Sequence, residues 1–149
     1  MKFKDENEIL ALVRSFEEAS IGRDEWHHAE HLAVALYYVS RVDLDTATQK
    51  MRGGLLNLLR EGFGVDFAKE MPFHETLTTF WMRTMHLYSL GADSKSLQEM
   101  ANDVVCLYDK EYPLRFYTRE TLYSERARST FVEPDLIDAD HPSDHFSPI

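Results

Sequence analysis

Three histidines lie close together in the segment EWHHAEHLAVALYY, residues 25–38: His27, His28 and His31. Neutral imidazoles three or four residues apart on one helix can chelate a borderline metal such as zinc, iron or nickel. A single imidazole can instead act as a general acid or base, because its pKa lies near physiological pH. The simplest alternative is that these histidines are core side chains that hydrogen-bond to the backbone.

The helical period separates the three histidines. Each residue of a helix advances by about 100°, so three apolar residues lie within about 40° of His28: Leu32, Ala35 and Val39. His28 therefore points into the core, His31 lies about 60° to one side, and His27 lies about 100° round, towards a groove or solvent.

A second stripe of this kind begins at His74 in the segment PFHETLTTFWMRTMHLY, residues 72–88. Four residues lie within about 40° of His74: Thr78, Trp81, Met85 and Tyr88. The dipole at a helix start disfavours positive charge, which favours a neutral imidazole at position 74. If the two helix starts meet, we expect His28, His31 and His74 to form one buried polar cluster, with Glu75 on its flank.

Apolar positions at helical spacing predict five helices: residues 5–20, 24–41, 45–61, 72–90, and a last one from Ser94 or Ser96 to about 107. Asp24 is expected to cap the second helix, and Pro72 to lie in the first turn of the fourth. Gly53 and Gly54 should weaken the third helix by about 1 kcal/mol each relative to alanine.

Beyond Tyr112 and Pro113 the chain is richer in arginine and tyrosine, and a short helix is expected at residues 124–128. The last 13 residues contain several aspartates, prolines and serines, a composition typical of disorder. No alternating strand pattern is visible. We therefore predict an all-α fold: a single-domain bundle of about five helices over residues 1–136, whose part beyond Pro113 is an irregular C-terminal strap, followed by a disordered acidic tail at 137–149.

The composition narrows the choice of partners. The formal net charge of the 149 residues is -10, which disfavours nucleic acid and anionic membrane surfaces. The single cysteine, Cys106, cannot form an intrachain disulfide and fits a reducing compartment. There is no apolar signal segment, and no apolar run approaches the roughly 18 residues of a membrane span. We predict a cytoplasmic protein without nucleic-acid or membrane partners.

Four motifs together carry a resemblance: W-x-H-x-x-H-L from Trp26, F-H-E-T-L-T-x-F-W from Phe73, Y-T-R-E-x-L from Tyr117 and F-V-E-P-D-L from Phe131. The chain resembles a family of small uncharacterised bacterial proteins over roughly residues 16–136. The resemblance implies a bacterial protein but no particular activity, and it marks these motif positions: His28, His31, His74, Glu75, Trp81 and the turn at 133–135. The chain departs from the family late in the third helix, where it reads LLREGFG instead of containing a tyrosine-asparagine pair.

The first functional hypothesis is an open metal site with His28, His31 and His74 as ligands to zinc, iron or nickel, and with Glu75 or water as the fourth ligand. Two familiar metal motifs are excluded. The segment HHAEH lacks the glutamate of HExxH, and EWHH is the only Glu-x-x-His, whereas a ferritin-like di-iron site needs two.

The second hypothesis is a metal-free site in which His28 or His74 is the general base and Glu75 or Glu133 orients it. Arginine guanidinium groups would bind an anionic ligand. The predicted ligand-binding residues are Trp81, Thr78, Arg115, Tyr117, Arg119 and Glu133.

Both hypotheses describe a small-molecule enzyme or binding protein. The alternative is a non-catalytic scaffold or a homodimerisation module whose histidines are structural, with His28 bonded to Thr78 and the arginines clipping the strap to the acidic bundle.

Overall fold

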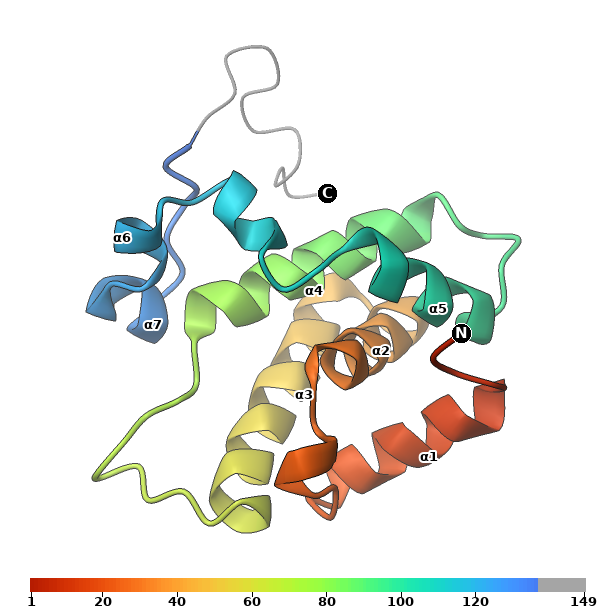
Figure 1. Ribbon diagram of the computed structural model, residues 1–149, viewed down its shortest axis with the longest axis horizontal. Helices are drawn as coiled ribbons and strands as arrows, with labels where there is room; N and C mark the ends of the chain where they lie inside the picture. Colours follow the sequence, from red (N-terminus) through yellow and green to blue (C-terminus); the bar gives the residue numbers. More distant parts are fainter. Residues whose placement is uncertain (137–149) are drawn as a thin grey trace.

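The computed structural model describes residues 1–136, and these form a bundle of α-helices without a β-strand among them (Figure 1). The predicted all-α fold class is confirmed. The five longer helices are α1 (Glu6–Glu17), α2 (His28–Arg41), α3 (Leu44–Asn57), α4 (Glu75–Leu90) and α5 (Leu97–Leu107). The shorter elements are η1 (Arg23–Glu25), the π-helical η2 (Leu58–Gly62), η3 (Tyr112–Arg115), α6 (Arg119–Leu122) and α7 (Glu125–Ser129). The predicted tail lies outside the described residues.

Helix α2 is the centre of the bundle, because it packs against α1, α3, α4 and α5. Its segment 32–36 is fully buried, which explains why apolar residues surround this helix in the sequence. Helices α6 and α7 lie beside the start of α4, on the side away from α1 (Figure 1). Within residues 1–136, no helix is both long enough and apolar enough to cross a bilayer.

Two predicted helix starts are wrong, and in both cases a histidine occupies the N-cap position. Helix α2 begins at His28 after the N-cap His27, whereas Asp24 lies in the separate turn η1. Helix α4 begins at Glu75, so Pro72 lies outside it, and the His74 side chain accepts the hydrogen bond expected of a capping group.

The two adjacent glycines of α3 have different surroundings. A β-carbon at Gly54 would overlap the ring of Phe16 on α1, so α1 can approach α3 only because position 54 lacks a side chain. A β-carbon at Gly53 would meet nothing within 4 Å. Close packing therefore requires glycine at position 54 but not at position 53.

We expect Gly54→Ala to lower the free energy of unfolding by about 1–3 kcal/mol, because Phe16 must move. Gly53→Ala is the matched control and should raise it by up to about 1 kcal/mol through helix propensity. Urea denaturation of both variants measures the difference. Equal shifts would contradict the packing role of Gly54.

Candidate functional site

His28 joins the start of α2 to the end of α5. Its Nε2–H donates a hydrogen bond to the carbonyl oxygen of Tyr108 at 2.8 Å, and because a carbonyl only accepts, Nε2 carries the proton. The ring also meets Trp81 edge-on, with 5.1 Å between centroids. The predicted bond to Thr78 is wrong, since the Thr78 hydroxyl donates to the carbonyl oxygen of His74 at 2.9 Å.

His31 is the histidine with an unsatisfied group. Its ring stacks on Trp26, with centroids 5.9 Å apart, and within residues 1–136 its buried Nε2 has no hydrogen-bond partner. Burial, assisted by the neighbouring His28, lowers the pKa of His31 to about 4. The ring is therefore neutral at neutral pH, and its unpaired nitrogen costs about 1–3 kcal/mol of desolvation.

His74 has both ring nitrogens occupied. Nδ1 accepts from the backbone N–H of Leu77 at 3.1 Å, which caps α4, and Nε2–H donates to the carbonyl oxygen of Leu122 at 2.7 Å. Burial, and to a smaller extent the charge of Arg128, lower the pKa of His74. This neutral imidazole therefore fastens α6 to α4, and a metal could bind it only by displacing one of these backbone groups.

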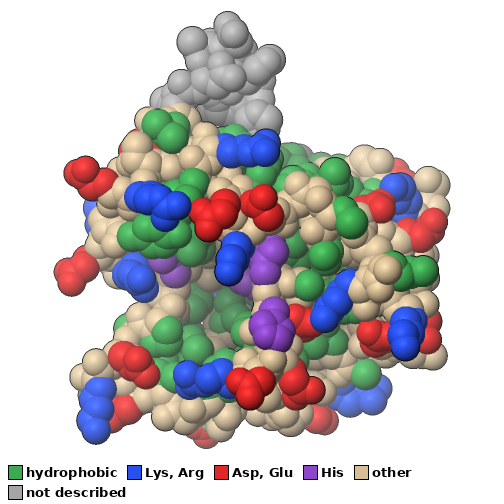
Figure 2. Space-filling model, viewed as in Figure 1, with side chains coloured by type: hydrophobic (Ala, Val, Ile, Leu, Met, Phe, Trp, Pro, Cys, Tyr) green, Lys and Arg blue, Asp and Glu red, His purple; other side chains and the backbone are tan. Residues whose placement is uncertain are grey.

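The three histidines do not form one ligand set. His28 and His31 lie together at the start of α2, whereas His74 is bonded to its own helix and to α6. Figure 2 shows histidine side chains near the centre of one face, beside a hollow with hydrophobic side chains on its floor. Among residues 1–136 no group of three or more His, Cys, Asp or Glu side chains is placed to hold a metal ion. Within residues 1–136 the metal hypothesis thus lacks a third ligand.

None of the predicted ligand-binding residues lines the cavity between α3 and α4 that is described below. Trp81 and Tyr117 are buried against Phe80, with ring centroids 5.2 and 6.2 Å from it. The exposed Arg119 lies 3.4 Å from Glu111 in a surface ion pair. Arg115, which stacks on Tyr112, and Glu133 are exposed as well, while Thr78 is buried in α4.

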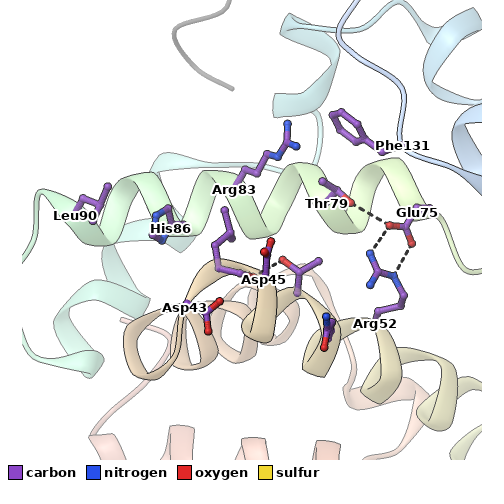
Figure 3. A pocket seen from close by; sticks show the side chains of 12 residues that line it. Asp43, Asp45, Arg52, Glu75, Thr79, Arg83, His86, Leu90 and Phe131 are labelled. Atoms are coloured by element: carbon purple, nitrogen blue, oxygen red, sulfur yellow. Dashed lines mark hydrogen bonds and ion pairs between the residues drawn. The ribbon is translucent and has the colours of Figure 1, made fainter. Parts of the chain in front are cut away.

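Glu75 is the one predicted site residue that lines a cavity between α3 and α4. This cavity, here called the α3/α4 groove, has a volume of about 810 Å³. Its lining comes from two helices, the residue before α3 and the strap: Asp43, Leu44, Asp45, Thr48, Gln49, Arg52, Glu75, Thr79, Arg83, His86, Leu90 and Phe131. Figure 3 shows Arg52 of α3 opposite Glu75 of α4 at one end of the groove, while Arg83 of α4 points towards Phe131.

Charged groups fix the shape of this groove. Arg52 donates to both carboxylate oxygens of Glu75, at 2.8 and 2.5 Å, and this bond raises the pKa of Arg52. The Thr79 hydroxyl donates to the same carboxylate at 3.2 Å. At the other end, His86 has a buried Nδ1 without a partner in residues 1–136. The bidentate pair holds one end of the groove in a fixed geometry.

Sequence reasoning missed Arg52, His86 and Asp45. The spacing of Glu75, Thr79 and Arg83 by four residues was a usable signal, because such residues share one face of a helix. Arg52 and Glu75, however, are 23 positions apart. Their pairing depends on how α3 and α4 pack, which periodicity alone does not determine.

Comparisons of the chain with protein-family models, curated proteins and solved structures found no match. Its function is therefore inferred from the geometry of its own side chains.

We expect His31, whose ring nitrogen Nε2 is buried, to make the protein sensitive to acid. Its pKa of about 4 in the folded chain lies below the ordinary 6.5, so the unfolded chain binds the proton more readily between these values. The contribution of neutral His31 to the free energy of unfolding is thus fully present above about pH 6.5. It is lost as the pH falls towards 4, which lowers the free energy of unfolding by up to about 3 kcal/mol.

Denaturation at a series of pH values measures this contribution as the difference between wild type and His31→Leu, which should lose less stability in acid. If His31→Leu had the wild-type slope, His31 would not be the titrating group.

Proposed function

We propose that this chain binds an elongated small molecule with polar and apolar parts in the α3/α4 groove and that His28 and His74 hold the bundle and strap together. The observation that carries the proposal is the groove itself. Its volume of about 810 Å³ lies within the roughly 300–1,000 Å³ of small-molecule sites. Charged side chains also converge on it from two different helices.

The lining indicates the kind of ligand. Glu75 and Leu90 lie 15 residues apart on α4, or about 22 Å at 1.5 Å per residue, so the groove is long. At one end Arg52 neutralises Glu75, whereas no ion pair within residues 1–136 involves Asp43 or Asp45 at the other end. An elongated molecule with both polar and apolar parts fits this lining best.

Binding, rather than catalysis, is the activity that these contacts support. Glu75 is the only predicted catalytic residue in the groove, and both its oxygens are occupied by Arg52 and Thr79. Such fixed donors and acceptors reduce the ordering cost of binding.

A specific observation favours the second candidate, a non-catalytic interaction module. His28 and His74 each donate Nε2–H to a backbone carbonyl, which is what structural histidines do. This candidate predicts the same stable bundle, but no small molecule in the groove.

Fragment screening by NMR on the ¹⁵N-labelled chain distinguishes the two. We expect fragments that shift the amide signals of groove residues, and we expect Gln49→Trp to weaken their binding about tenfold or more by filling the groove. Lys50→Trp is the matched control, because this neighbouring exposed residue does not line the groove. Fragments that bind elsewhere, or bind Gln49→Trp equally well, would contradict the proposal.

A further inference from the structure

The last described segment, residues 130–136, has no helical structure and supplies Phe131 to the α3/α4 groove. The guanidinium of Arg83 lies over the Phe131 ring, 4.5 Å from its centroid. In Figure 3 the Phe131 ring stands beside Arg83 and Thr79. This segment, here called the terminal segment, therefore forms part of the wall near the Glu75 end.

The first turn of α4 serves both the terminal segment and the groove. The fully buried Thr76 donates its hydroxyl to the carbonyl oxygen of Thr130 at 2.9 Å and accepts the N–H of Val132 at 3.1 Å. These two bonds bracket Phe131, whereas the adjacent Glu75 faces the groove. Thr76 thus sets the position of the aromatic wall.

The other end of the terminal segment is hydrogen-bonded to α6 and to the residues just before α6. Asp135 accepts the backbone N–H of Thr118 at 2.8 Å, and the hydroxyls of Thr118 and Thr121 at 2.7 and 2.8 Å. The N–H of Leu136 donates to the carbonyl oxygen of Phe116 at 2.9 Å. Between these ends, the Tyr117 hydroxyl donates to the carbonyl oxygen of Val132 at 2.6 Å.

The terminal segment is held mainly by polar bonds. All of its residues are half-buried or exposed, so its release would uncover little apolar surface. The helices, in contrast, are anchored in the core by fully buried side chains such as Phe16, Leu36 and Phe80. Segments with few buried apolar contacts open locally at a free energy far below that of global unfolding.

We propose that the terminal segment is a removable wall of the α3/α4 groove, which releases from α4 and from residues 116–121 as one unit and admits a molecule at the Phe131 end while the bundle stays folded. This inference rests on the proposed function of the groove, but the release itself needs no ligand.

Amide hydrogen exchange tests the release. Thr76→Val keeps the side-chain shape but removes both bonds to the terminal segment, so we expect the amides of Val132 and Leu136 to exchange about tenfold faster or more. Asp135→Ala should accelerate the same two amides from the opposite end. Thr84→Val is the matched control, because Thr84 is also buried on α4 but its hydroxyl bonds only within the helix, to Phe80.

The pattern of exchange decides whether the terminal segment is one unit. Equal acceleration at Val132 and Leu136, with the α2 amides unchanged, supports it. Acceleration only next to each substitution would overturn the single unit, and acceleration throughout α2 would overturn local release.

Thiol labelling tests whether release opens the groove. Thr79→Cys in a Cys106→Ser background places one thiol in the groove, and methanethiosulfonate ethylammonium is the probe. We expect Thr76→Val to increase the labelling rate about tenfold, and Thr84→Val to leave it unchanged. If neither Thr76→Val nor Thr84→Val changed the labelling rate, the inference that the terminal segment is a wall of the groove would be overturned. Neither measurement uses a ligand, so a groove that bound no fragment would overturn only the proposed function.

Discussion

The backbone groups at the start of α4 need partners, and the way the chain supplies them organises the rest of the structure. A helix start leaves backbone N–H groups without partners inside the helix. His74 satisfies one of them with Nδ1 and uses Nε2–H to bind α6. Because one imidazole performs both tasks, the cap of α4 and the docking of the strap are coupled. Only the neutral ring can do this, since a protonated Nδ1 could not accept.

Adjacent residues of the same turn serve different surfaces. Glu75 binds Arg52 of α3, while Thr76 binds residues 130 and 132. A helix turns by about 100° per residue, so neighbours in sequence must face different partners. This is why a five-residue stretch, HETLT, joins α3, α4 and the strap. The groove and the strap are therefore both supported by the first turn of α4.

The helices could be predicted from the sequence, but their exact starts and contacts could not. Periodicity identified α1 to α5, because burial on one side imposes a repeat of apolar residues. It placed the start of α4 at Pro72, since proline is an ordinary first residue, whereas the histidine that caps the helix is an unusual choice. The sequence correctly predicted that the side chains of His28 and His74 point inward. The direction of a side chain, however, does not reveal its hydrogen-bond partner. Their partners are backbone carbonyls of Tyr108 and Leu122, groups that every residue carries and no sequence pattern marks.

At several of the motif positions, hydrogen bonds in the structure explain why the particular residue type is present. A neutral ring with a donor and an acceptor suits position 74, and a carboxylate suits position 135, where it accepts from Thr118 and Thr121. These contacts fasten the C-terminal strap. His31 is different, because leucine would fill its place without leaving a buried nitrogen unpaired. Within residues 1–136 the unpaired Nε2 of His31 is a cost that packing alone does not explain, so among the three histidines it is His31, rather than His28 or His74, whose residue type no hydrogen bond accounts for.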